Sequence, residues 1–242
     1  MAGPDPRDPF SLYQPTPTLE GWDSLDLSDL TLGIYPPWFQ HASAGLVSAC
    51  EEMLEQFKRK GTKLREVVIP DLEAGRVAHL ITIAAEMVQA LSDTYAAHHR
   101  EHSLDVRLNL ASARAFTAAD YVHAQQVRAR LIANLNRALK RVDVIVTPTT
   151  GLTAPIIPKA ALSSGESDLA TLTEIIRFVT PANMTGLPAI SFPAGYDDVG
   201  LPIGMQAIGH AWQEHTLLRL ALSAERAVER KPPRVHYRIL PE

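Results

Sequence analysis

Residues 142–150 read Val-Asp-Val-Ile-Val-Thr-Pro-Thr-Thr, and this stretch decides the fold class. The segment from Val142 to Val146 is apolar at nearly every position, which is typical of a strand buried on both faces in the middle of a helix-covered sheet. A Thr-Pro turn follows the strand. Because α/β sheets place ligand crevices beyond the carboxyl ends of their strands, Pro148 and Thr149 are candidate substrate-binding residues.

The residues before this strand show alternating strand and helix patterns. Short strands are predicted at 31–35 and 64–69, on either side of a helix over 44–60 that ends at Gly61. A strand–helix–strand unit of this spacing makes its two strands parallel. Two longer helices are predicted over 72–99, with Asp71 as its cap, and over 118–139, where Thr117 and Asp120 stand at capping-box spacing. The 72–99 helix is expected to bury the face that carries Val77, Ile81, Ala84, Val88, Leu91 and Tyr95.

The residues after the strand predict a loop, a helix, a hairpin and a last helix. The loop runs from Pro148 to about Gly165, and a helix covers roughly 169–183. Strands at 189–194 and 203–208 flank a turn-rich link and form an antiparallel hairpin, and a final helix covers about 213–229. The fold class is therefore α/β, with a mixed β-sheet covered by helices. The predicted organisation is a linker rich in proline and aspartate at 1–30, a folded region at 31–230 and an irregular tail at 231–242.

Composition excludes several classes of protein and site. The 242 residues carry a net charge of -4 without a concentrated basic patch, which argues against a nucleic-acid partner. Cys50 is the one cysteine, so no internal disulfide can form, and its place on an apolar helical stripe indicates a buried residue rather than a nucleophile. No segment is long and apolar enough to be a transmembrane helix, and no secretory signal is recognisable, so a cytoplasmic location is expected. The histidines at 98, 99 and 102 lack a metal-site pattern and are interpreted as a solvated helix end, so no metal site is predicted there.

Three segments together resemble the amidase-signature family. They are the strand and Thr-Pro turn at 142–150, the Thr-Pro-Ala-Asn-Met-Thr-Gly-Leu-Pro-Ala-Ile-Ser-Phe-Pro-Ala-Gly stretch at 180–195, and the Gly-Leu-Pro-Ile-Gly-Met-Gln-Ala-Ile-Gly stretch at 200–209. Their order and spacing look like the last third of that family, and the resemblance covers nearly the whole chain. It implies a C-terminal half of an amidase that hydrolyses a carboxamide C–N bond to an acid and an amine, without a metal or a cofactor. It also places Asn183 and Arg177 near the pocket wall as further candidate substrate-binding residues, although Arg177 could instead pair with Glu174 one turn back.

The catalytic residues of the family are expected to be absent from this chain. The resemblance implies a serine nucleophile, a second serine with a cis peptide and a lysine, with the serines in a stretch rich in glycine and serine in the first half of the protein. Glycine-rich turns would aim backbone donors at the oxyanion. No two glycines are adjacent here, and the nearest imitation, Ser163-Ser164-Gly165, lies after the Thr-Pro loop and is interpreted as a solvated turn. We therefore expect the chain to be inactive alone. In the family a Gly-Pro-Asp-Pro stretch follows the catalytic half, so Met1 is expected to occupy an internal position. A truncated gene model, a cloned fragment and a split product are three explanations that stay open.

Two branches of the family and one other class of function remain in competition. The pattern around 177–180 and 120–121 looks closer to fatty-acid amide hydrolases and general amidases than to the A-type subunit of glutamyl-tRNA amidotransferase, which is the first alternative. The second alternative is a non-catalytic chain that associates with a complementary half. The expected partners are a small-molecule amide substrate, once an N-terminal half completes the site, and another copy through an exposed sheet edge.

Overall fold

The computed structural model of the chain describes residues 4–8, 11, 13–159 and 168–232. Five strands form one mixed sheet in the order β2-β1-β3-β5-β4. The strands are β1 (Thr31–Ile34), β2 (Lys63–Glu66), β3 (Val144–Pro148), β4 (Ala189–Tyr196) and β5 (Pro202–Gly209). β1 is parallel to both β2 and β3, whereas β5 is antiparallel to β3 and to β4. The predicted fold class, the parallel pair and the hairpin are confirmed.

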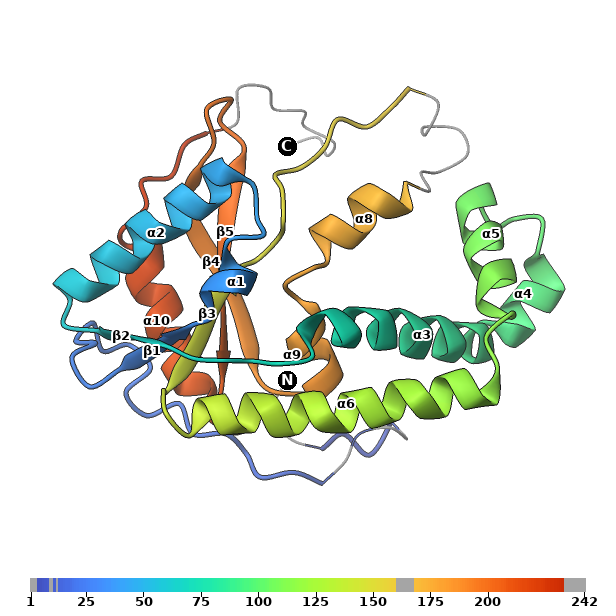
Figure 1. The fold of residues 1–242 in the computed structure, drawn as a ribbon, viewed down its shortest axis with the longest axis horizontal. Coiled ribbons are helices and arrows are strands. Elements are labelled where there is room, and N and C mark those ends of the chain that lie inside the picture. Colours follow the sequence, from blue (N-terminus) through green and yellow to red (C-terminus); the bar gives the residue numbers. More distant parts are fainter. Residues whose placement is uncertain (1–3, 9–10, 12, 160–167, 233–242) are drawn as a thin grey trace.

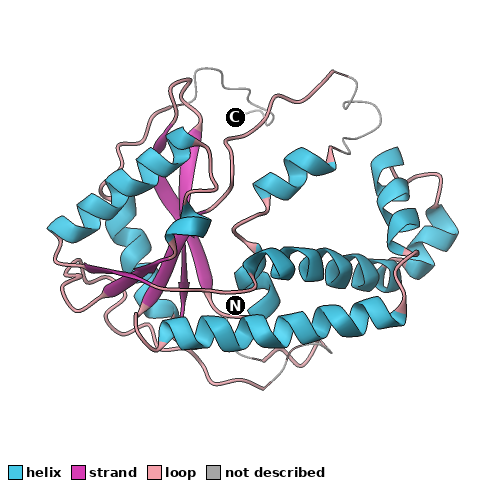
Figure 2. Cartoon of the chain, in the orientation of Figure 1, coloured by secondary structure: helices cyan, strands magenta, loops and turns pink. Residues whose placement is uncertain are grey.

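Helices cover both faces of the sheet. They are α1 (Pro36–Phe39), α2 (Ala44–Arg59), α3 (Leu72–Ala90), α4 (Ser92–His98), α5 (Leu104–Ala113), α6 (Ala118–Leu139), α8 (Leu169–Ile175), α9 (Thr180–Thr185) and α10 (Glu214–Glu225). Figure 1 shows α2 and α10 on one side of the sheet and α3, α6 and α9 on the other. α4 and α5 lie at the far end of the antiparallel pair formed by α3 and α6. Figure 2 shows that this helical extension carries no strand.

The central strand β3 is buried at all five of its residues. The expectation of a strand covered on both faces is thus confirmed, although it begins two residues later than the pattern predicts. The β4–β5 turn is stabilised by Asp197, whose carboxylate accepts the backbone N–H groups of Val199 at 3.1 Å and Leu201 at 2.8 Å. Gly200 in this turn has a φ of 89°, a backbone conformation that favours glycine.

The local end signals of two helices behave as the sequence predicts. Thr117 and Asp120 form a capping box, in which each side chain accepts the other residue's backbone N–H. At the end of α2, the N–H groups of Gly61 and Thr62 donate to the carbonyls of Lys58 and Phe57, which is the Schellman arrangement. Asp71 occupies the N-cap position of α3, but its side chain makes no capping hydrogen bond and instead accepts one from Asn134 at 3.1 Å.

The prediction of one helix over 72–99 is wrong, and its predicted buried face is confirmed only in part, since Ala84 is buried and Ile81 packs against the core but Val77 is exposed. The helix is interrupted at Leu91, and no side chain of α4 is buried, so tertiary packing does not extend the helix past that point. α3 buries small and polar residues where it meets α6, and a Cβ on Gly75 would lie only 3.0 Å from Leu131. This close approach of two helices selects small residues and leaves a row of apolar side chains exposed on α3. They are Val77, Leu80 and Ile83.

The helix predicted over 169–183 is also two helices, α8 and α9. Pro181 has no backbone N–H to donate to the carbonyl of Arg177, so a helix that ran through it would lose that hydrogen bond. In the first turn of α9, which begins at Thr180, the missing N–H costs no hydrogen bond. The break between Ile175 and Thr180 follows from this. α1 and α5 were not predicted, because the first has only four residues and the second lacks a one-sided apolar pattern.

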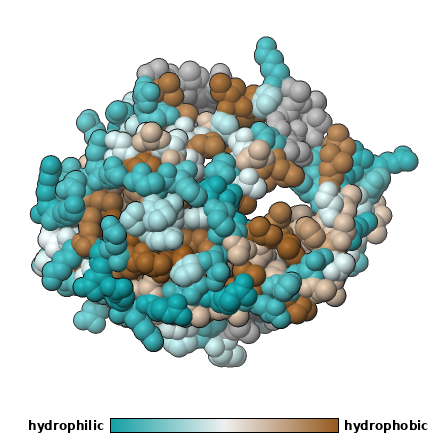
Figure 3. Space-filling model, viewed as in Figure 1, coloured by the Kyte–Doolittle hydropathy of each residue, from teal (hydrophilic) through white to brown (hydrophobic). Residues whose placement is uncertain are grey.

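No helix among the described residues is long and apolar enough to cross a membrane. Figure 3 shows apolar surface over α3 and beside α8, in addition to a patch next to α2. Exposed apolar residues of α3 and α8 include Leu80, Ile83, Leu169 and Leu172.

Cys50 lies in the core between α2 and β5, as the sequence predicts for a buried small residue. It is 0% exposed, and its Sγ lies 4.0 Å from the carbonyl oxygen of Gly204. Burial, helped by the charge of Glu51, raises the pKa of the Cys50 thiol to about 12. Below pH 9 the thiol is protonated in both the folded and the unfolded chain, so its contribution to the free energy of unfolding does not change with pH. Between pH 9 and about 12 only the unfolded chain loses the proton, so the folded state becomes less stable as the pH rises.

We expect Cys50 to react with Ellman's reagent at pH 8 at least about 100-fold more slowly in the native chain than in urea, because burial hinders both access and ionisation. The absorbance of the released thiolate measures both rates. A Cys50→Ala control should show no reaction in either state. Rapid labelling without denaturant would contradict a buried thiol.

Candidate functional site

The carboxyl end of β3 opens into a cavity beside the β4–β5 hairpin. The Thr149 N–H donates to the carbonyl of Gly204 at 3.0 Å, and this bond holds the strand end against β5. The Thr149 Oγ1 lies 2.7 Å from the Ser191 Oγ, so one hydroxyl donates to the other. Two hydroxyls from positions 42 residues apart therefore meet at the end of the buried strand.

The cavity next to this hydroxyl pair has a volume of about 570 Å³. Its lining combines hydroxyl groups with apolar side chains and contains no histidine, lysine, aspartate or glutamate among the described residues. The lining residues include Thr149, Thr153, Ile175, Ser191, Phe192 and Ile203. Such a lining can bind a neutral polar group through the hydroxyls and an apolar group beside it. It provides no general base that would activate either hydroxyl as a nucleophile.

Gly204 makes room for the hydroxyl pair. A Cβ at this position would lie 3.0 Å from the Thr149 Oγ1 and 3.2 Å from the Ser191 Oγ, closer than ordinary contacts allow. Neither Gly204 nor Ser191 was singled out from the sequence. The available signals were a glycine inside a strand pattern, which often marks close approach of another group, and strand alternation, which places Ser191 on the face opposite Phe192.

Arg177 lies in a cluster of charged side chains and not in the cavity lining. Its guanidinium donates to Glu174 through Nη2 at 2.8 Å and through Nε at 3.0 Å, and to Glu73 through Nη1 at 2.7 Å. The His41 Nδ1 lies 2.8 Å from the same Nη1, and the Trp38 ring packs against the guanidinium with 5.4 Å between the ring centroid and Cζ. Of the two interpretations left open by the sequence, pairing with Glu174 is the one present in the structure.

The electrostatics of this cluster favour charged forms of its members. Burial opposes the charge on Arg177, but its hydrogen bonds to Glu174 and Glu73 outweigh burial, so the pKa of Arg177 is raised. The hydrogen bond from Arg177 is the main reason that the pKa of Glu174 is lowered. Arg177 thus has its charge compensated by carboxylates of α3 and α8, and its side chain is only 11% exposed.

Gly151 connects the charged cluster to the cavity. Its N–H donates to the carbonyl of Glu174 at 3.0 Å, and its own carbonyl accepts the Ser43 N–H at 2.8 Å. The loop after β3 is therefore tied to the end of α8 and to the start of α2. Because Arg177 binds the side chain of Glu174, a chain of hydrogen bonds connects Arg177 through Glu174 and Gly151 to the loop that follows Thr149.

Asn183 and Pro148 have other surroundings. Asn183 is exposed on α9, and its Nδ2 lies 3.4 Å from the Nε2 of His79, whose pKa is lowered by burial. Pro148 is buried at the end of β3, opposite Met205 of β5. Thr149 thus lines the cavity, whereas Arg177 lies in the charged cluster. Pro148 lies in the sheet, and Asn183 contacts His79 of α3. Their roles in substrate binding stay predictions.

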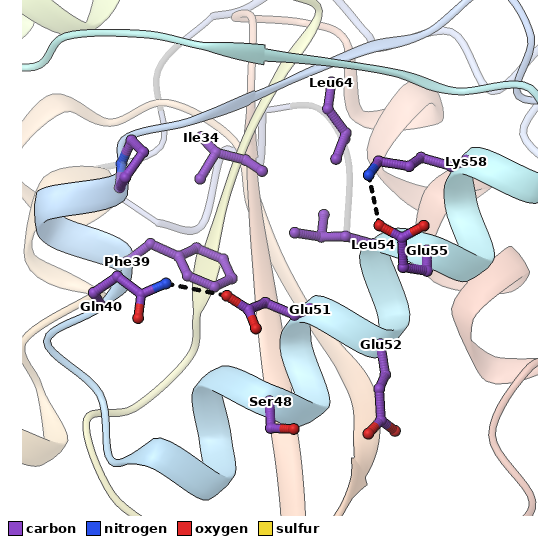
Figure 4. Close-up of a pocket in the computed structure, with 11 residues that line it drawn as sticks. Ile34, Phe39, Gln40, Ser48, Glu51, Glu52, Leu54, Glu55, Lys58 and Leu64 are labelled. Atoms are coloured by element: carbon purple, nitrogen blue, oxygen red, sulfur yellow. Dashed lines mark hydrogen bonds and ion pairs between the residues drawn. The ribbon is translucent and has the colours of Figure 1, made fainter.

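A second cavity, of about 510 Å³, lies between α2 and β1 (Figure 4). Its apolar lining comes from Ile34, Phe39, Leu54 and Leu64. Three glutamates of α2 line it, and Figure 4 shows Glu51 turned toward Gln40 and Glu55 toward Lys58. The contacts are 3.1 Å between the Gln40 Nε2 and the Glu51 Oε1, and 2.5 Å between the Lys58 Nζ and the Glu55 Oε1. This is an acidic helix surface over an apolar patch, and it contains no nucleophile paired with a base.

Within the described part of the chain, no three or more histidine, cysteine, aspartate or glutamate side chains are grouped to hold a metal ion. The His98 Nδ1 lies 2.8 Å from the Glu101 Oε1, and the rings of His99 and His102 contact Tyr95. The Ser163-Ser164-Gly165 turn lies outside the described residues.

Comparison with known proteins identifies the family. The amidase family model matches residues 1–218. This chain belongs to the amidase-signature family. It is 45% identical over 249 residues to a fatty acid amide hydrolase of Medicago truncatula, and 28% identical over 255 residues to the A-type subunit of a glutamyl-tRNA(Gln) amidotransferase of Microcystis aeruginosa. The matches cover 99% and 95% of this chain.

The amidase-signature fold is also found in solved structures. A bacterial aryl acylamidase described as an amidase-signature enzyme superposes with a TM-score of 0.73 at 20% identity, over 93% of this chain and 49% of the acylamidase chain. The chain spans 41% of the length of the Medicago relative and 51% of the Microcystis relative. These 242 residues therefore correspond to about half of a family member or less.

Proposed function

We propose that this amidase-signature chain forms the substrate-binding C-terminal part of an amidohydrolase, which cleaves a carboxamide to an acid and an amine. The observation that carries the proposal is the Thr149–Ser191 hydroxyl pair, 2.7 Å apart, at the cavity beyond β3. Two neutral hydroxyls can donate to a carboxamide oxygen and accept from its nitrogen. The nucleophile, its activating lysine and the oxyanion donors would come from the segment that the relatives carry outside the matched residues.

An apolar acyl group is the proposed substrate class. The cavity beyond β3 is lined by Ile175, Phe192 and Ile203 beside its hydroxyls. Further apolar surface continues over α8 and α3, where Leu172, Leu80 and Ile83 are exposed. A long hydrocarbon chain buries such surface favourably, at about 0.8 kcal/mol per CH₂ group. The 45% identity to the fatty acid amide hydrolase of Medicago truncatula supports the same class.

A chimera tests the proposal. The part of the Medicago relative that lies outside the match is fused before this chain, and release of fatty acid from a long-chain fatty amide is measured. We expect turnover by the chimera and none by the 242-residue chain alone. Release of ammonia from glutamine, with no turnover of the fatty amide, would favour the amidotransferase alternative and contradict an apolar substrate.

Removal of the hydroxyls gives a prediction at residue level. Thr149→Val in the chimera is expected to lower kcat/KM about tenfold, because one hydrogen bond to the substrate is lost while the side-chain shape is kept. Ser191→Ala should act in the same direction, and the double variant should lose less than the product of the two effects because the hydroxyls bind each other. Thr173→Val on α8, at a half-buried position that does not line the cavity, is the matched control, with unchanged kcat/KM. Unchanged kcat/KM in Thr149→Val, Ser191→Ala and the double variant would show that the hydroxyl pair does not bind the substrate.

A further inference from the structure

The cavity of about 510 Å³ between α2 and β1, which we call the α2 groove, has an acidic side and an apolar side. Figure 4 shows the glutamates along α2, and Ile34 and Leu64 on the opposite side of the groove. Ile34 and Leu64 are only partly buried. Three glutamates and one lysine line the groove, which leaves it with a net charge of -2. Its lining therefore suits a ligand that is both basic and apolar.

Part of the negative charge of the groove is uncompensated. Glu55 is paired with Lys58, whereas Glu51 accepts a hydrogen bond from the neutral amide of Gln40, which leaves its charge in place. Glu52 makes no hydrogen bond or ion pair with any residue in the ranges that the structure describes. Glu51 and Glu52 can therefore each pair with a cation that enters the groove.

The described part of the chain ends beside α2. The Lys231 N–H donates to the Tyr196 hydroxyl at 3.0 Å, and the Lys231 Nζ lies 5.0 Å from the centroid of the Tyr196 ring. Gly195, the residue before Tyr196, packs against α2, since a Cβ on Gly195 would lie 3.6 Å from the Cβ of Ala49. Ser48, the residue before Ala49, already lines the groove. The chain beyond Lys231 therefore starts next to the helix that carries the glutamates.

The sequence beyond that point is both basic and apolar. Residues 233–240 read Pro-Arg-Val-His-Tyr-Arg-Ile-Leu and lie outside the described residues. They contain two arginines and no acidic residue, and polar and apolar side chains alternate from Arg234 to Ile239. In an extended chain successive side chains point to opposite sides. This sequence can therefore present its arginines to one wall of a groove, and Val235, Tyr237 and Ile239 to the other.

The dimensions of the groove agree with the length of this sequence. From Ser48 to Lys58 the groove follows about ten residues of helix, or about 15 Å. An extended chain from Arg234 to Ile239 spans about 17 Å. The three steps from Lys231 to Arg234 span up to about 10 Å, which is the width of one helix. The chain is therefore long enough to pass over α2 and to fill the groove.

We propose that residues 234–239 of this chain bind in the α2 groove, with Arg234 and Arg238 against the glutamates of α2 and the apolar side chains against Ile34 and Leu64. Because this sequence is tethered beside α2, its effective concentration is on the order of millimolar, so even a weak contact stays substantially occupied. A separate basic peptide lacks this advantage. The inference does not depend on the proposed function, since the groove shares no lining residue with the cavity beyond β3.

Photo-crosslinking tests the proposal in the 242-residue chain. Tyr237 is replaced by p-benzoylphenylalanine, the chain is irradiated, and the joined peptides are identified by mass spectrometry. We expect the main cross-link to join residue 237 to the segment 34–64 within a single chain. Arg234→Glu combined with Arg238→Glu should lower its yield at least about fivefold, because like charges then meet in the groove.

An exchange of charges distinguishes the groove from other acidic surfaces. Glu51→Arg and Glu52→Arg, added to the charge-reversed sequence, should restore the yield of the cross-link to at least about half of its original value. The matched control is Glu225→Arg with Glu229→Arg, two exposed glutamates close to Lys231 in the chain, and it should restore nothing.

Four results would overturn the inference. They are the absence of any cross-link, a main cross-link to residues outside 34–64, a product with twice the mass of the chain, and a yield that charge reversal leaves unchanged. The third result would assign the groove to a second copy of the chain. Rescue by the control pair equal to that by Glu51→Arg and Glu52→Arg would also count against the groove, since the contact would then follow net charge alone.

Discussion

Replacing Gly151 by alanine is expected to lower the free energy of unfolding by about 3 kcal/mol. An added Cβ would lie 2.5 Å from the backbone oxygen of Glu174, which is far inside contact distance and meets an atom that no side-chain rotation can move. Relief of the clash requires the loop after β3 to shift away from α8. That shift would break the hydrogen bonds that Gly151 makes to Glu174 and to Ser43.

Urea unfolding followed by circular dichroism measures this effect. Gly45→Ala is the matched control, because a Cβ on Gly45 meets no atom within 4 Å, and alanine is the better helix former in α2. We expect the control to be neutral or to gain up to about 1 kcal/mol. In the chimera, Gly151→Ala should also reduce turnover, since the displaced loop carries Thr149. Equal stabilities of the two glycine variants would show that the loop has more room than the structure indicates.

Replacing Arg177 by methionine is expected to lower the free energy of unfolding by about 2 kcal/mol at pH 7. The substitution keeps the apolar contact with Trp38 but removes one of the two arginines that Glu73 and Glu174 share. The other is Arg76, which lies 3.0 Å from Glu73 and 3.4 Å from Glu174. The loss is smaller than for a fully buried ion pair, because the Glu73 and Glu174 side chains are 60% and 38% exposed and regain water. Arg7→Met breaks an exposed pair with Asp5 and should leave the free energy of unfolding unchanged.

The effect of Arg177→Met should depend on pH. The pKa of Glu174 is lowered in the folded chain, mainly by its hydrogen bond from Arg177. The stabilisation is therefore present above the pKa of an unfolded glutamate, which is about 4.3, and is lost as the pH falls through the lower folded value. We expect the difference between wild type and variant to shrink between about pH 5 and pH 3. If the difference in free energy of unfolding does not change with pH, the loss of stability comes from packing alone.

Short-range patterns predicted much of the fold. The apolar run at 142–146 indicated a buried central strand, and the link at 195–200 indicated a hairpin, because both depend on residues close together in the chain. The capping box of Thr117 and Asp120 spans three residues and is present in the structure. Helix ends that depend on packing were predicted less well. The break at Leu91 depends on where burial stops, which no local pattern gives. The break before Thr180 follows from Pro181, a local signal that the helix predicted over 169–183 overlooked.

For the candidate site, the sequence by itself determined that Thr149 stands just beyond the central strand, because strand polarity and the Thr-Pro turn are local properties. Only the tertiary structure decided that Ser191 meets it and that Arg177 is bound by Glu73. Those contacts span 42 and 104 residues of chain. No local pattern specifies which distant side chain reaches a given atom, since that depends on how β4, β5 and α3 pack around β3.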